Sequence, residues 1–95
     1  MRVLGIDPGT RLTGYGCVEG PLHSLAPPRL VEAGVVRLVR GKETPSLASR
    51  LSELARDVSV LLARVRPELL GIESLFSNPR HPGPVLSMAP ARCLL

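Results

Sequence analysis

Two acidic residues each follow a short apolar run, and their position makes them the strongest candidates for chemistry in this chain. Asp7 follows the run at 3–6, and Glu73 follows the run at 69–72. Nearly continuous apolar runs of this length are typical of strands buried on both faces. A carboxylate at the end of such a strand needs a metal ion, a cation or several N–H donors. Asp7 also fits a second interpretation, in which it only caps its own turn, and the motif alone leaves that choice open.

The residues after Asp7 predict a hairpin and then a third strand. Pro8-Gly9 turns the chain sharply, and a second strand is expected to run to Glu19. The segment 30–40 is rich in Val and Leu and predicts another strand, and Gly34 within it is consistent with a bulge.

A helix is predicted between this third strand and the strand that ends at Glu73. Thr44 stands where an N-cap belongs and Pro45 where the first helical residue belongs, while Pro67 ends the helix. Charged residues, Arg64 among them, are expected on its solvated face. Its apolar face is formed by residues at steps of three and four: Leu47, Leu51, Leu54, Val58, Leu61 and Val65.

A helical crossover of this length predicts that the strand at 68–73 lies parallel to an earlier strand. If that strand is the first one, Asp7 and Glu73 emerge side by side at one edge of the sheet. Two close carboxylates suit Mg²⁺ or Mn²⁺, with a substrate phosphate completing the ligands. Such a site is the core of two-metal phosphodiester hydrolysis. The alternative for Glu73 is an acid stabilised by the dipole of a following helix.

The segment that follows Glu73 carries polar groups on a proline-stiffened loop. Phe76 either stacks on a nucleic-acid base or tucks under its own loop, and the sequence does not decide between these. Residues 85–95 are expected to begin another helix, which Pro90 interrupts or delays. The polar candidates of the loop are Ser77, Asn78, Arg80 and His81.

Composition predicts a single domain over residues 1–95 without a membrane span. The net charge is +4 and eleven of the twelve basic residues are Arg, which permits a nucleic-acid partner without establishing one. Cys17 and Cys93 lack the spacing of a zinc site or a disulfide framework, so buried thiols in a reducing compartment are expected. No signal peptide or long apolar segment is evident, and a cytoplasmic protein is the default expectation.

Three motifs resemble the RuvC family of Holliday junction resolvases. They are G-I-D-P-G-T-R-L-T-G-Y-G at 5–16, I-E-S-L-F at 72–76 and the N-P-R-H-P…A-R segment at 78–92, in the order and spacing of the family. The D-P-G-T turn alone also occurs in sugar-kinase, Hsp70-type and YqgF-type proteins. The combination with E-x-x-F after a helical crossover is more specific.

The resemblance implies an α/β fold of the RNase H-like type, a mixed sheet with a helical crossover. It implies a homodimer that resolves four-way DNA junctions in recombination and repair, with Mg²⁺ as cofactor (Mn²⁺ as an alternative) and the RuvA–RuvB branch-migration complex as partner. By this resemblance Asp7 and Glu73 are catalytic and metal-binding, and Phe76 stacks on bases at the junction centre. Asn78, Arg80 and His81 then lie on a DNA-facing loop.

The chain also departs from the family pattern, and these departures indicate a C-terminally truncated resolvase. The family's last two metal-binding acids and fifth strand are expected to be missing, so this chain is expected to have little or no nuclease activity. A catalytically dead module that binds branched DNA is the alternative. A nucleotide-binding fragment of the sugar-kinase type is a third interpretation, but it requires a second phosphate loop that the sequence lacks.

Overall fold

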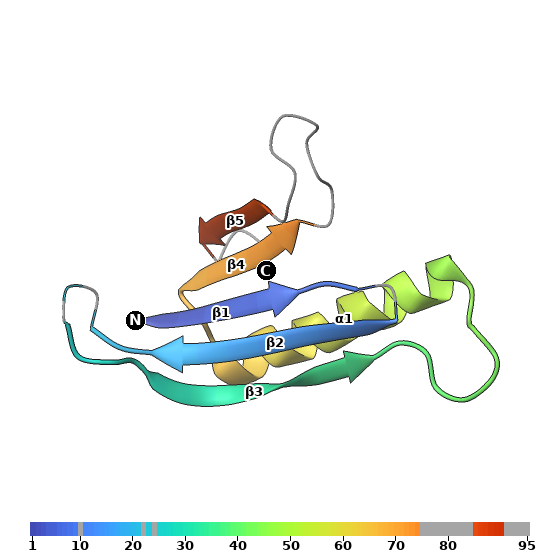
Figure 1. Cartoon of the computed structure of the whole chain (residues 1–95), viewed down its shortest axis with the longest axis horizontal. Coiled ribbons are helices and arrows are strands. Elements are labelled where there is room, and N and C mark those ends of the chain that lie inside the picture. Colours follow the sequence, from blue (N-terminus) through green and yellow to red (C-terminus); the bar gives the residue numbers. More distant parts are fainter. Residues whose placement is uncertain (10, 22, 24, 75–84, 91–95) are drawn as a thin grey trace.

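The computed structural model describes residues 1–9, 11–21, 23, 25–74 and 85–90, with backbone alone for 74 and 85–89. The described residues form one mixed sheet and one helix (Figure 1). Three strands come first in the chain, and the helix and two further strands follow. The elements are β1 (Arg2–Asp7), β2 (Leu12–Glu19), β3 (Arg29–Arg37), α1 (Leu47–Val65), β4 (Leu69–Ser74) and β5 (Val85–Pro90).

The strand order β3-β2-β1-β4-β5 confirms the predicted crossover. β1 pairs antiparallel with β2 and β2 with β3, so the first three strands form a meander. α1 then returns the chain so that β4 pairs parallel with β1, with Leu4 opposite Leu70 and Ile6 opposite Ile72. A parallel neighbour requires such a crossover, because a short turn can only reverse the chain. The carboxyl ends of β1 and β4 therefore lie side by side.

The hydrophobic core lies between α1 and one face of the sheet. Side chains of a strand alternate between faces, so one set from each strand points at the helix. Burying each large aliphatic side chain there contributes about 1.5–3 kcal/mol. The buried core consists of Leu4, Ile6, Cys17 and Leu70 from the sheet and Leu61, Leu62 and Val65 from the helix.

The prediction of a buried thiol is confirmed for Cys17. Its side chain is fully buried and forms no disulfide, and burial raises the pKa of the thiol above its usual value. It therefore packs as a small apolar group. Cys93 lies outside the described residues.

The helix begins later than the sequence predicts. Ser46, not Thr44, is the N-cap, and its Oγ accepts the N–H of Ser49 at 3.1 Å. Pro45 consequently precedes the cap and is not the first helical residue. Leu47 and Leu51, assigned to the apolar face, are more than half exposed, because the first turns of α1 extend past the ends of the strands (Figure 1).

The segment 85–90 forms β5, so the predicted helix there is wrong. β5 pairs antiparallel with β4, and Gly71 lies opposite Met88. Pro84 and Pro90 bracket a segment too short to sustain a helix, whereas the edge of β4 offers unpaired backbone groups to an extended segment. The described part of the sheet therefore has five strands, the last of them formed by a segment that was expected to be helical.

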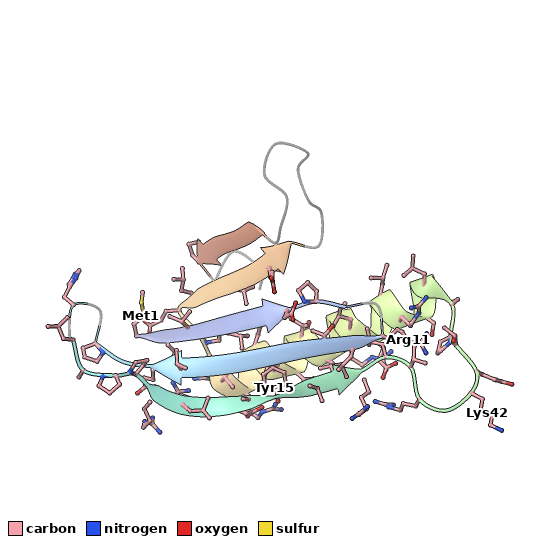
Figure 2. All side chains as sticks on the ribbon, in the orientation of Figure 1. Met1, Arg11, Tyr15 and Lys42 are labelled. Carbon is pink, nitrogen blue, oxygen red and sulfur yellow. The ribbon has the colours of Figure 1, made fainter. Side chains whose placement is uncertain are left out.

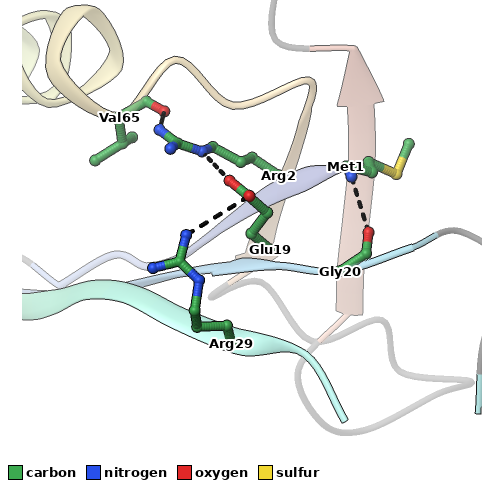
Figure 3. A network of polar contacts seen from close by, with 6 residues as sticks. All are labelled: Met1, Arg2, Glu19, Gly20, Arg29 and Val65. Carbon is green, nitrogen blue, oxygen red and sulfur yellow. Dashed lines mark hydrogen bonds and ion pairs between the residues drawn. The ribbon is translucent and has the colours of Figure 1, made fainter. Parts of the chain in front are cut away.

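A network of polar contacts connects the C-terminal end of α1 to the first residue of β1 and to the neighbouring ends of β2 and β3 (Figure 3). Arg2 pairs with Glu19 and also donates from Nη1 to the Val65 carbonyl at 2.7 Å, while Arg29 approaches the same Glu19 at 3.6 Å. The hydrogen bond from Arg2 lowers the pKa of Glu19. Next to it the Met1 ammonium donates to the Gly20 carbonyl at 2.8 Å. These contacts fix the register of β1 against β2, and so the position of Asp7.

Candidate metal and nucleic-acid site

The structure places Asp7 and Glu73 next to each other at the carboxyl ends of β1 and β4. Ile6 and Ile72 are register partners, and each acid is the next residue on its strand. Asp7 is exposed and Glu73 half-buried. The Asp7 carboxylate, which accepts a hydrogen bond from the protonated Glu73 carboxyl and repels its charged form, raises the pKa of Glu73, and burial adds to the shift. Two carboxyl groups that share a proton in this way form a site that a divalent cation can occupy instead.

The local geometry bears on the alternative interpretations of the two acids. The Gly9 N–H donates to Thr13 Oγ1 at 3.3 Å, so a threonine, and not Asp7, accepts the described N–H of this turn. Glu73 lies inside β4 and does not begin a helix. Both carboxylates therefore remain available to a ligand.

Thr13 is a positioning residue that the sequence analysis missed. Its side chain is buried, and its hydroxyl both accepts from the Gly9 N–H and donates to the Gly9 carbonyl at 3.3 Å. Gly9 is required there, because a Cβ would lie 2.2 Å from the Leu12 carbonyl oxygen. The repeated T-x-x-T of the turn was the available signal. Thr13 thus fixes the turn that directly follows Asp7.

The two acids lie on the face of the sheet opposite α1, and we call this the open face. Asp7 alternates with Ile6, which is buried against the helix, so the two side chains point to opposite faces. Gly14 is the register partner of Asp7, and Gly5 is opposite both Gly16 and Gly71. A Cβ added at Gly14 or Gly16 would meet nothing within 4 Å. The acids therefore stand beside nearly bare backbone that a bulky ligand can approach.

A second polar cluster, on the helix side, joins three elements and was also missed. Arg64 of α1 binds Glu32 of β3 through two hydrogen bonds, of 3.0 Å and 2.6 Å, and Tyr15 of β2 donates to the same carboxylate at 2.7 Å. Arg64 first, and Tyr15 second, lower the pKa of Glu32 to about 2. Arg64 is thus a structural contact and not the simple solvated charge that was predicted. A half-buried Tyr hydroxyl, which needs a partner, was the signal.

The remaining predicted site residues lie outside the described residues. Phe76, Asn78, Arg80 and His81 all fall within 75–84. Within the described ranges, no group of three or more His, Cys, Asp or Glu side chains could hold a metal ion. In that same part of the chain, no helix is both long and apolar enough to cross a membrane.

Comparison with known proteins connects this geometry to one family. The sequence model of the family described as crossover junction endodeoxyribonuclease RuvC matches residues 3–95. The RuvC protein of Alkalilimnicola ehrlichii is 46% identical over 91 residues, which cover 96% of this chain and 50% of that protein. The RuvC protein of Frankia alni is 48% identical over 78 residues, covering 82% of this chain and 37% of that protein. The chain spans half or less of the length of these relatives.

Solved structures show the same relationship. Thermus thermophilus RuvC superposes with a TM-score of 0.66 at 32% identity, over 80% of this chain and 44% of that one. The same protein in complex with a Holliday junction substrate gives a TM-score of 0.62 at 29% identity, over 83% and 45% respectively. The sheet with its helical crossover is therefore of the RNase H-like type, as the motifs predicted.

Proposed function

The chain belongs to the RuvC family of crossover junction endodeoxyribonucleases, and we propose that it acts on four-way DNA junctions by metal-dependent phosphodiester hydrolysis. The observation that carries this proposal is the pair of carboxylates at the ends of β1 and β4. Asp7 and Glu73 share a hydrogen bond on a face of the sheet where Gly14 stands directly opposite Asp7. In the T. thermophilus complex the related protein is bound to a Holliday junction substrate.

Asp7 and Glu73 fit a Mg²⁺ ion, with Mn²⁺ as the alternative. Both supply hard oxygen donors, and Mg²⁺ is commonly held by one or two carboxylates and substrate phosphates. When bound, such an ion supplies charge stabilisation at the phosphate and activates the attacking water. The chain's own part is to hold the two carboxylates in register through β1 and β4, which the Thr13 turn and the paired strands accomplish.

The DNA-contact residues and the partners in this proposal rest on the family resemblance. We propose that Phe76 stacks on bases at the junction centre and that Asn78, Arg80 and His81 contact DNA. We also propose a homodimer, a role beside RuvA–RuvB in recombination and repair, and a cytoplasmic location. The names of the relatives, crossover junction endodeoxyribonuclease RuvC, support a DNA junction as the ligand.

A second candidate is a branched-DNA-binding module that does not cut. The described residues bring together two acids and no third metal-ligating side chain. Two carboxylates alone hold a divalent ion weakly, so junction binding without cleavage is the expected behaviour of this second candidate.

The test is incubation of the chain with a labelled four-way junction or a linear duplex, in Mg²⁺ or in EDTA. Symmetric cutting of the junction in Mg²⁺ alone supports the nuclease, and binding without cutting supports the module. Asp7→Asn and Glu73→Gln are each expected to abolish cutting and to spare binding, while Glu43→Gln, an exposed acid on the loop before α1, serves as the matched control. Cutting that survives Asp7→Asn would show that the metal site is misassigned. No preference for the junction would refute both candidates.

A further inference from the structure

Two arginines at the carboxyl end of the sheet have no acidic partner among the described residues. Arg11 and Arg37 are exposed and form no ion pair within those ranges. Arg11 and Lys42 lie at the same end of the molecule, beyond the tip of β1 (Figure 2). By contrast, four described arginines form ion pairs with three glutamates: Arg2 and Arg29 with Glu19, Arg40 with Glu53 and Arg64 with Glu32.

The sheet register places Arg37 on the open face together with Asp7. Gly14 is opposite Asp7 on one side and opposite Val35 on the other, so these three residues share a face. Arg37 follows Val35 by two residues and returns to that face. A strand spacing of about 4.8 Å and a rise of about 3.4 Å per residue put the Arg37 and Asp7 Cα atoms roughly 12 Å apart.

Arg11 lies against the end of the same strand. Its carbonyl accepts the N–H of Leu38 at 2.9 Å, and Leu12, the next residue, is the register partner of Arg37. The turn after Asp7 thus brings Arg11 to the end of β3. Arg11 and Arg37 are therefore neighbours along the backbone at the junction of β2 and β3, beyond the carboxylate pair.

The surface between the carboxylates and these arginines is open at Gly14 and apolar beside it. Gly14 leaves open space where a side chain would stand, and Val35 and Leu12 are each about half exposed. A surface that begins with a cation site and continues to two arginines suits an extended polyanion. Guanidinium groups form strong, often bidentate, hydrogen bonds with phosphate.

We propose that Arg11 and Arg37 bind the phosphodiester backbone of DNA beyond the phosphate held at Asp7 and Glu73. The inference rests on the proposed function, because it takes the carboxylate pair as the point of attack. The DNA strand then crosses the open face from β4 over Gly14 toward the end of β3. The contacts are to the backbone, so they add affinity for DNA of any sequence.

The experiment measures binding of a fluorescent four-way junction by the chain at salt concentrations from about 50 to 200 mM. Arg11→Gln and Arg37→Gln are each expected to weaken binding roughly tenfold at low salt, since each removes a charged hydrogen bond. Each is also expected to lower the slope of log K against log salt by about 0.9, and the double variant by about twice that amount. Arg37→Lys, which keeps the charge, is expected to restore the slope.

Arg56→Gln is the matched control, because Arg56 is an exposed arginine of α1 on the other side of the sheet. It is expected to leave both affinity and slope unchanged, and thermal melting of all variants checks that the fold is kept. If Arg11→Gln and Arg37→Gln behave like Arg56→Gln while the parent chain binds the junction, the proposed surface is wrong and the proposed function stands. If the parent chain binds no DNA, both are wrong. Normal binding by Asp7→Asn together with weak binding by Arg37→Gln supports the surface independently of cleavage.

Discussion

The two faces of the sheet use the same strands for opposite purposes. On the side of α1, Tyr15, Glu32 and Arg64 satisfy one another's polar groups, and a cluster of apolar side chains from the sheet and the helix is buried. On the open face, Gly14 lies opposite Asp7 and leaves open space beside it, and the acids are not part of a buried cluster. The contrast teaches that one layer of side chains holds the fold together, which leaves the other layer free to expose a pair of neighbouring carboxyl groups.

The largest effect is expected when the covered face loses a core side chain. Leu4 is fully buried, so Leu4→Ala should lower the free energy of unfolding by about 2–5 kcal/mol. Val35 is half exposed on the open face, and Val35→Ala should change it by about 0.5 kcal/mol or less. Urea unfolding of both variants measures the difference. Equal losses would show that the open face is covered in solution.

Two glycines provide an intermediate test of the same contrast. At Gly34 a Cβ would lie 2.8 Å from the Tyr15 hydroxyl oxygen, so Gly34→Ala must displace that ring and should cost about 1–3 kcal/mol. At Gly14 a Cβ meets nothing, so Gly14→Ala should stabilise the strand by about 0.5–1 kcal/mol. The sign of the change in melting temperature distinguishes them. If Gly14→Ala lowered the melting temperature as much as Gly34→Ala, there would be no open space beside Gly14 on the open face.

The smallest effect is expected from acid, acting on the Glu32 cluster. Arg64 and Tyr15 depress the pKa of Glu32 from 4.5 to about 2, so its contribution is complete above pH 4.5 and is lost as the pH falls toward 2. The stability difference between the parent chain and Glu32→Gln should therefore shrink across that range, as measured by urea unfolding at several pH values. Tyr15→Phe removes only one of the two partners of the carboxylate. The stability difference between the parent chain and Tyr15→Phe should therefore depend on pH less than the difference for Glu32→Gln does. A difference that does not depend on pH would exclude the cluster as its source.

Local patterns predicted the sheet and the crossover because they depend on periodicity and on chain length. The apolar runs before Asp7 and Glu73 fixed two strands, and a helix between them left parallel pairing as the compact solution. The start of α1 was misplaced because Thr44 and Ser46 are both good caps, and the loop from β3 decides between them. Such a choice depends on tertiary structure.

Only the part of the candidate site that depends on strand topology could be predicted from the sequence. Proximity of Asp7 and Glu73 followed from the topology, whereas the Thr13 hydroxyl and the Arg64–Glu32 pair connect residues that no local pattern links. The segment 85–90 was misassigned because its apolar residues fit a helix and a strand equally well, and the free edge of β4 determined the outcome. Long-range partners decide what a short apolar run becomes.

The parallel pairing of β1 with β4 has a consequence for the order of folding. β1, β2 and β3 are neighbours in the chain, and hairpins of this kind form in about 1–10 μs. β4 reaches β1 only after the chain has closed a loop that contains the whole meander and α1, and such non-local contacts form slowly. We therefore expect the two carboxylates to meet in the last step of folding, so that a divalent ion would find its site only in a nearly complete domain.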